Sequence, residues 1–292
     1  MYKRQLPYQR EGIQALVERH QLLLADDMGL GKTIQVLAAL RILFQRGVIQ
    51  RALIVAPASL LRQWKKEATK WAPELKTAII AAPASERAAL WRSSAHVYIV
   101  GYETIREDVS PNHPTPATKE PWDVVVLDEA SKIKNRDSRV AKAVKLLPRR
   151  RRWALTGTPL ENRIDDVCSI LEFVLNESVP ARPLYPSAEK LRVLLSEHQL
   201  RRRKADVLKE LPPKTVDNIL LDLLPAQRGA YDLAERAGIV QLRERGAKVT
   251  ITHILELITR LKQLCNVDPA SGQSSKIEDI ERRLQVVIEE GH

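Results

Sequence analysis

Between residues 22 and 174, short apolar runs alternate with longer segments in which apolar residues recur every three or four positions. Short continuous apolar runs are typical of buried strands, and the longer period is typical of helices. The alternation predicts an α/β fold, a doubly wound parallel sheet with helices on both faces. The predicted strands are Leu22–Ala25, Ala52–Ala56, Thr77–Ala81, Val97–Gly101, Val124–Asp128 and Arg152–Thr156. Helices are predicted at Ala58–Trp71 and Asn162–Val174.

After residue 174 the pattern changes, because several prolines between 180 and 213 interrupt the chain. We expect a first domain at 1–198 and a second, mainly helical part at 199–292. That part is predicted to hold one strand, Thr215–Asp222, and helices at about Pro225–Gly246, Ile251–Cys265 and Ser275–Glu290.

Composition restricts the partners and the location. The 292 residues carry a formal net charge of +11, clustered in part at 149–152 and 201–204. Such runs suit a polyanion, although solvated helix ends are the alternative. The two cysteines, Cys168 and Cys265, lie in helical patterns and are interpreted as core thiols. No apolar stretch is long enough for a membrane span, so we expect a soluble cytoplasmic protein.

A phosphate-binding loop follows the first predicted strand. The segment between that strand and the next helix reads Asp26-Asp27-Met28-Gly29-Leu30-Gly31-Lys32-Thr33. Its glycines allow backbone N–H groups to surround phosphates at the positive end of a helix. Lys32 would reach the β and γ phosphates, and Thr33 would help to hold Mg²⁺. Asp26 stands where the strict pattern has glycine, so the match is imperfect.

An acidic pair, Asp128 and Glu129, ends the fifth predicted strand. In phosphoryl transfer, Asp128 would coordinate Mg²⁺ and Glu129 would orient the attacking water. The alternative is an ordinary strand-to-loop junction. The pair gains weight because it follows a phosphate-binding loop in the same chain.

A series of ordered segments closely resembles the SWI/SNF-type ATPases of helicase superfamily two. The segments are LPYQREG, DDMGLGKT, VAPASLLRQW, VYIVGYET, DEASKIKN, LTGTPLEN, LRRRKADVLKELPPK, LPAQRGAYDLAE and RLKQLCNVDP. The resemblance covers nearly the whole chain. It implies a RecA-like ATP-binding lobe of an ATP-dependent double-stranded DNA translocase, which uses ATP and Mg²⁺.

The resemblance also implies roles for particular residues. Gln9 would contact the adenine edge, and the family's aspartate-rich loop accounts for Asp26. Nucleotide would be bound by Gln9, Asp27, Met28, Gly29, Leu30, Gly31, Lys32 and Thr33. The residues implied in DNA contact or coupling are Pro57, Ser59, Thr156, Gly157 and Thr158. Trp64 and Trp71 are expected to be packing residues rather than base-stacking platforms.

Three departures from the family affect the expected activity. Ser131 stands where many relatives have histidine or glutamine. The segment from Leu175 to Leu200 is shorter than the protrusion of eukaryotic remodellers, which favours a compact bacterial or archaeal type. Residues 199–292 are expected to be a linker and the incomplete start of a second RecA-like lobe, because the chain stops where that lobe's first nucleotide-facing strand would begin. The missing part supplies catalytic arginines, each worth about 10³ to 10⁵ in rate. We therefore expect weak Mg-ATP binding, very slow hydrolysis, and exposed apolar helix faces beyond about Thr215.

Two other functions stay open at this point. The first is a strand-separating superfamily two helicase, which the segments LRRRKADVLKELPPK and RLKQLCNVDP disfavour. The second is a non-catalytic DNA-binding or regulatory fragment of a motor, whose DNA affinity would fall steeply with ionic strength.

Overall fold

The computed structural model describes residues 5–109, 116–157, 164–177, 187–210 and 216–291. The chain divides into two compact units, Met1–Pro212 and Pro213–His292. The first unit extends beyond residue 198, where the sequence had placed the boundary, because the following residues join its sheet.

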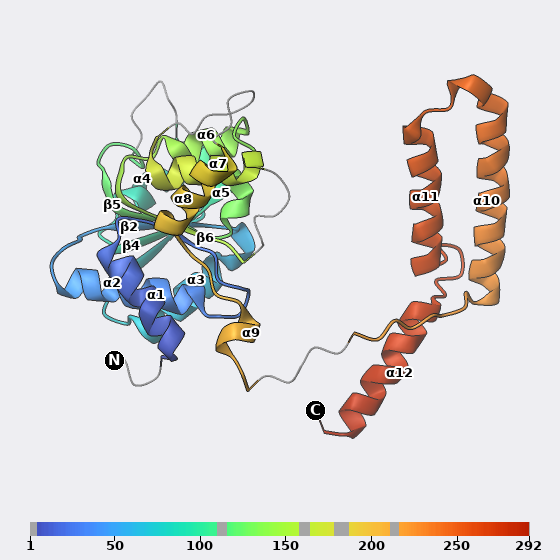
Figure 1. Cartoon of the computed structure of the whole chain (residues 1–292), viewed down its shortest axis with the longest axis horizontal. Helices are drawn as coiled ribbons and strands as arrows, with labels where there is room; N and C mark the ends of the chain where they lie inside the picture. Colours follow the sequence, from blue (N-terminus) through green and yellow to red (C-terminus); the bar gives the residue numbers. More distant parts are fainter. Residues whose placement is uncertain (1–4, 110–115, 158–163, 178–186, 211–215, 292) are drawn as a thin grey trace. The chain divides into compact units, whose positions relative to one another are not determined.

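The first unit is built on a seven-stranded, parallel sheet (Figure 1). The strand order is β3-β4-β2-β5-β6-β1-β7. The strands are β1 (Gln21–Leu24), β2 (Ala52–Ala56), β3 (Thr77–Ile80), β4 (Val97–Gly101), β5 (Trp122–Leu127), β6 (Arg149–Leu155) and β7 (Gln199–Leu200). The six predicted strands are confirmed, β2 and β4 with the predicted bounds and the other four with shifted ends, and the two-residue β7 was missed.

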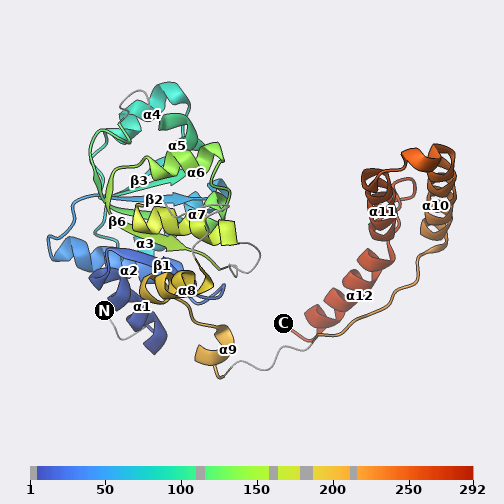
Figure 2. The same ribbon diagram turned by 45° about the horizontal axis from the view of Figure 1, so that its top comes forward.

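Helices cover both faces of the sheet, as Figure 2 shows, so the doubly wound α/β prediction is confirmed. One face carries α1 (Pro7–Glu18), α2 (Lys32–Gln45), the short 3-10 helix η2 (Ala58–Leu60) and α3 (Leu61–Trp71). The other face carries α4 (Ala84–Trp91), α5 (Tyr102–Asp108), η3 (Ala130–Ile133), α6 (Arg139–Lys145), α7 (Ile164–Leu175) and α8 (Ala188–His198). The short α9 (Lys204–Val207) follows β7.

Two apolar layers explain why the strands read as continuous apolar runs. Successive side chains point to opposite faces, so Leu22 and Leu24 join the core under α1 to α3, and Leu23 joins the other core. Because both faces are covered, polar alternation is absent from these strands.

The second unit is helical. It contains α10 (Pro225–Arg245), η4 (Gly246–Lys248), α11 (Ile251–Asn266) and α12 (Ser275–Glu289), and α10 and α11 lie side by side (Figure 1). Residues 216–224 form no regular structure, so the strand expected at Thr215–Asp222 is wrong over its described part. The described residues provide no neighbouring strand to pair its backbone groups, and Leu220 is 97% exposed.

The expected exposed apolar faces are confirmed on the second unit. Large apolar side chains that face solvent include Leu233, Ile239, Ile251, Leu255, Ile280, Leu284 and Ile288. Cys168 is buried in α7, as predicted, whereas Cys265 is only partly buried, so it is not a core thiol. None of the described helices is long and apolar enough to span a membrane.

Candidate nucleotide site

The sheet brings the predicted site residues to one edge. Parallel strands end on the same side, and β2, β5, β6, β1 and β7 are consecutive neighbours. Ligands in doubly wound sheets bind beyond these carboxyl ends. The residues that directly follow the five strands are Pro57, Asp128, Thr156, Ala25 and Arg201.

The phosphate loop curves from β1 into α2. Gly29 and Gly31 have φ values of +85° and +77°, which lie in the left-handed region that glycine adopts without strain. Gly31 is the N-cap of α2, and Lys32 is its first residue. The Lys32 amine donates hydrogen bonds to the carbonyl oxygens of Asp26 (2.8 Å) and Asp27 (3.3 Å).

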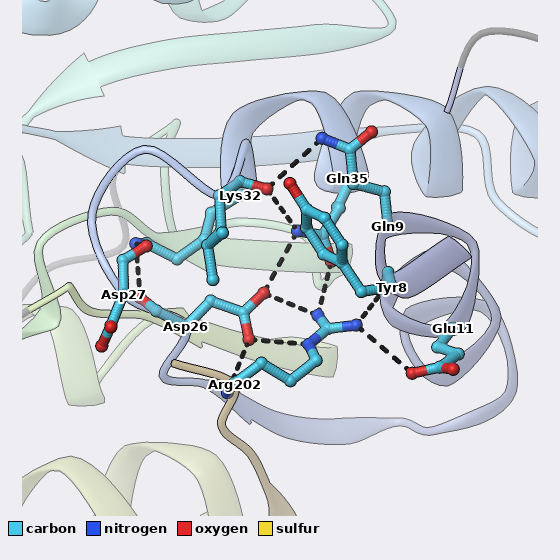
Figure 3. A network of polar contacts seen from close by, with 9 residues as sticks. Tyr8, Gln9, Glu11, Asp26, Asp27, Lys32, Gln35 and Arg202 are labelled. Carbon is cyan, nitrogen blue, oxygen red and sulfur yellow. Dashed lines mark hydrogen bonds and ion pairs between the residues drawn. The ribbon is translucent and has the colours of Figure 1, made fainter. Parts of the chain in front are cut away.

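Gln9 lies against this loop (Figure 3). Its amide nitrogen donates to the Leu30 carbonyl at 3.3 Å, and its amide oxygen accepts from the Leu6 backbone N–H at 3.1 Å. A Cβ atom on Gly31 would lie 2.7 Å from the Gln9 Nε2 atom. The φ of +77° favours glycine at position 31, and a larger residue would also require the Gln9 side chain to move.

The acidic pair lies at the end of β5. Asp128 is 9% exposed, and one carboxylate oxygen accepts from the Trp64 indole N–H at 2.7 Å. Its other oxygen accepts from the Glu129 backbone N–H at 3.0 Å. Burial raises the pKa of Asp128, and the hydrogen bond from Trp64 opposes that rise. The backbone of Glu129 is left-handed, with φ of 50°.

Electrostatics link the loop to the acidic pair. Burial, followed by the neighbouring Asp128 charge, raises the pKa of Glu129, whereas Lys32 lowers it. Burial lowers the pKa of Lys32, and Asp26, Glu129 and Asp128 act in the opposite direction. The charges of Lys32, at the start of α2, and of the two acids after β5 therefore interact with one another.

The end of β6 closes the site from a third strand. A Cβ atom on Gly157 would lie 2.7 Å from the Met28 Cγ atom and 3.2 Å from the Lys32 Nζ atom. A larger residue at position 157 would therefore require the Met28 side chain to move. Thr156 is buried, and its backbone N–H donates to the Leu24 carbonyl at 3.1 Å.

The remaining predicted residues are placed less closely. Thr33 lies half-buried in the first turn of α2. Pro57 is the N-cap of η2, and Ser59 is exposed in that helix. Thr158 lies outside the described residues. Ser131 lies in η3, two residues after Glu129 in the sequence.

Sequence reasoning missed the part that Arg202 plays at this site. The run 201–204 was a candidate polyanion contact, yet the Arg202 side chain is 9% exposed and pairs with Asp26 at 2.6 Å. A signal was available, because Asp26 follows a buried strand and an acid there requires a partner. The 149–152 run likewise lies in β6, where burial lowers the pKa of Arg149 to about 9.

Trp64 is a packing residue, as predicted, with 1% exposure. Its hydrogen bond to Asp128 was not foreseen. The bond connects α3, which follows the predicted DNA-contacting segment, to the acidic pair. Trp71 is only partly buried and donates to Glu67 at 2.9 Å.

The parallel sheet, the strand–loop–helix at β1 and the acidic pair at β5 define a RecA-like, nucleotide-binding domain of the P-loop class. Within that class the chain belongs to the SNF2-related domain family, whose model matches residues 8–270.

Named relatives agree with this assignment. The chain is 35% identical over 282 residues to an uncharacterized ATP-dependent helicase of Mycoplasma pneumoniae, covering 91% of this chain and 27% of the relative. It is 29% identical over 285 residues to an ISWI chromatin-remodeling complex ATPase of Saccharomyces cerevisiae, covering 89% and 25%. The chain thus spans about a quarter of the length of these relatives.

Solved structures show the same architecture. The chain is similar to the Sulfolobus solfataricus SWI2/SNF2 ATPase core in complex with dsDNA, with a TM-score of 0.60 and 28% identity. That match covers 98% of this chain and 65% of the other. A second structure, of the Sulfolobus solfataricus SWI2/SNF2 ATPase core domain, matches with a TM-score of 0.62 and 26% identity, covering 98% of this chain and 64% of the other.

Proposed function

We propose that this chain is the ATP-binding lobe of an ATP-dependent double-stranded DNA translocase. The observation that carries the proposal is the convergence of Lys32 with Asp128 and Glu129 at one edge of a parallel sheet. ATP would lie with its phosphates in the loop 27–33 and its adenine edge at Gln9. Lys32 would neutralise the β and γ phosphates.

The donor set fits Mg²⁺. Asp128 offers a buried carboxylate whose two oxygens each accept one N–H, which leaves further lone pairs for a cation. Thr33 offers a hydroxyl group in the first turn of α2. Among the described residues no cluster of three acidic, histidine or cysteine side chains could hold a metal alone. Mg²⁺ characteristically binds one or two carboxylates together with substrate phosphates, so this sparse set suits an ion that arrives with ATP.

Asp128 and Glu129 would have different roles in hydrolysis. Glu129 would orient the attacking water, since its carboxyl lies beside Asp128 and its pKa is raised. A second RecA-like lobe, in cis or in trans, would supply the cations that stabilise charge on the transferring phosphoryl group. The length of the relatives supports this expectation. The lobe alone would turn over ATP very slowly.

Duplex DNA is the proposed polymer along which the complete motor would move. The net charge of +11 and the dsDNA named with the Sulfolobus neighbour support a backbone-directed, sequence-independent contact. Pro57 and Ser59 at η2, with Thr156, Gly157 and Thr158 after β6, are the proposed contact and coupling residues. We further propose that the protein acts in the cytosol or nucleoid of a bacterium or archaeon.

The testing experiment measures Mg-ATP binding by calorimetry, followed by steady-state ATP hydrolysis with and without duplex DNA. Lys32→Ala provides the blank, and Lys190→Ala, on the exposed start of α8, is the matched control. Binding that is lost only in Lys32→Ala is expected. No binding by the unmodified chain would contradict the proposal.

Turnover separates the remaining alternatives. Hydrolysis at the level of the blank supports a site that a second lobe must complete. DNA-stimulated hydrolysis well above the blank would show that this chain completes catalysis by itself. Salt-sensitive DNA binding without nucleotide binding would favour the regulatory fragment, and strand separation by the longer protein would favour a helicase.

A further inference from the structure

The carboxylate of Asp26 is the centre of a buried polar network at the start of the phosphate loop (Figure 3). It is fully buried and accepts four hydrogen bonds. One oxygen accepts from the backbone N–H (3.1 Å) and Nε (2.9 Å) of Arg202, and the other from Arg202 Nη2 (2.6 Å) and Gln35 Nε2 (3.2 Å). The bidentate geometry is the strong form of an arginine–carboxylate pair.

Arg202 connects this carboxylate to two further elements. Its Nη1 atom donates to the Tyr8 carbonyl in α1, and Nη2 donates to the Gln35 amide oxygen in α2 at 2.9 Å. A Cβ atom on Gly12 would lie 1.7 Å from Gln35 Oε1 and 2.8 Å from Arg202 Nη2, so a larger residue there would displace both side chains. One guanidinium group therefore fixes the positions of α1, α2 and the residue that begins the loop.

Backbone contacts from the same segment continue into the loop. The Ala25 N–H donates to the Leu200 carbonyl at 2.8 Å, and the Asp27 N–H donates to the Arg202 carbonyl at 3.0 Å. The Lys204 N–H donates to the Asp27 carboxylate at 2.9 Å. Residues 200–204 thus extend the pairing of β1 with β7 alongside the loop.

These contacts matter because Asp26 interacts with Lys32 through a hydrogen bond and through its charge. The Asp26 carbonyl accepts from the Lys32 amine at 2.8 Å, so the backbone at position 26 determines where that amine lies. A buried carboxylate that loses its cationic partner is destabilised enough to move or to take up a proton. Loss of Arg202 should therefore loosen the loop before it affects the distant sheet core.

We propose that Arg202 is a positioning residue for the phosphate loop: it acts through Asp26 and does not touch the nucleotide. The inference deepens the proposed function and rests on it for its consequence in nucleotide binding. Because residues 200–204 bond to Ala25, Asp26 and Asp27, a displacement of this segment would also displace the start of the loop.

The first test is independent of nucleotide. Arg202→Lys keeps the charge but cannot form the bidentate pair, and Arg203→Lys makes the same change at the exposed neighbouring side chain. Hydrogen exchange of the amides of residues 27–33 is expected to be about ten-fold faster in Arg202→Lys only. The amides of β2 and β4 should keep their protection. Unchanged loop exchange in Arg202→Lys would overturn the inference.

A second variant covers the case in which Arg202→Lys fails to fold. Asp26→Asn keeps the size of the side chain and removes the buried charge, so Arg202 loses its ion pair. The same local increase in loop exchange is expected. Protection equal to that of the unmodified chain in a folded Asp26→Asn variant would also overturn the proposal.

The second test is Mg-ATP affinity, measured by calorimetry on the same variants. A loop that holds its binding conformation only about a tenth of the time binds about ten-fold more weakly, which corresponds to about 1.4 kcal/mol. Arg203→Lys should bind normally. Absence of binding in the unmodified chain would refute the proposed function, while faster loop exchange in Arg202→Lys would still establish the positioning role. Normal affinity in a loosened Arg202→Lys loop would refute the functional consequence.

Discussion

The hydrogen bond from Trp64 to Asp128 allows a quantitative prediction. In Trp64→Phe the aromatic packing is largely kept, but the buried carboxylate loses a donor at 2.7 Å. A hydrogen bond to a charged group contributes about 1.5 to 3 kcal/mol, and one to a neutral group about 0.5 to 1.5 kcal/mol. The smaller ring adds a cavity cost that any buried tryptophan would share.

Trp153→Phe is the matched control. Trp153 is fully buried, but its indole N–H donates only to the Arg19 carbonyl at 3.4 Å. Both variants lose the same ring volume, so the difference between them isolates the bond to the charge. At about pH 8, Trp64→Phe should therefore lower the free energy of unfolding by about 1 to 2 kcal/mol more than Trp153→Phe.

The sign of the pH dependence follows from the raised pKa of Asp128. A carboxyl group whose folded-state pKa is raised contributes its full stability at low pH and loses it as pH rises through that pKa. Trp64 limits this loss because its N–H stabilises the carboxylate. The extra cost of Trp64→Phe should therefore shrink as the pH is lowered from about 8 toward about 4, the ordinary pKa of an aspartate side chain.

Urea unfolding followed by tryptophan fluorescence can measure this difference in the first unit alone. All five tryptophans belong to that unit: Trp64, Trp71, Trp91, Trp122 and Trp153. Four remain as reporters in either variant. Equal destabilisation by the two substitutions at pH 8, or a difference that does not change with pH, would refute the reasoning.

Two further predictions concern glycines. Gly31→Ala should weaken the Mg-ATP affinity measured by calorimetry at least about ten-fold, because φ is +77° and the new Cβ would meet Gln9. Gly47→Ala is the control, since Gly47 has a φ of +67° but open space around it. It should lower the free energy of unfolding by only about 1 to 2 kcal/mol and leave the affinity unchanged. Gly229→Ala, on the exposed face of α10, should stabilise that helix by about 1 kcal/mol. Gly238→Ala would place a Cβ 2.3 Å from the Leu257 side chain of α11. In circular dichroism melts, Gly238→Ala should therefore be about 1 to 2 kcal/mol less stable than Gly229→Ala. Equal affinities in the first pair, or equal melts in the second, would contradict these expectations.

The sequence predicted most of the fold because its signals are local. An apolar run such as Ala52–Ala56 is buried on both faces wherever its strand lies in the sheet, so its type does not depend on topology. The phosphate loop was equally readable, since the left-handed glycines and the first turn of α2 are consecutive in the chain. Burial on two faces and turn chemistry are encoded within a few residues.

Weak or isolated elements were not readable in this way. The two-residue β7 has too short a pattern to be recognised, and it exists because β1 offers a free edge. The segment 216–222 contains a short apolar run, Ile219 to Leu221, but a strand needs a partner for its backbone groups.

The tertiary structure decided which charges are surface charges and which support the site. Arg202 belongs to a basic run in the sequence, yet the strand order places β7 beside β1 and buries its guanidinium group against Asp26. Trp64 reads as a packing residue, yet the neighbouring positions of β2 and β5 bring its N–H to Asp128. The sequence alone determined that a phosphate loop and an acidic pair exist. Their partners depended on the order of strands in the sheet, which local periodicity does not encode. The physical reason is that interaction energies arise only between residues that the sheet brings together.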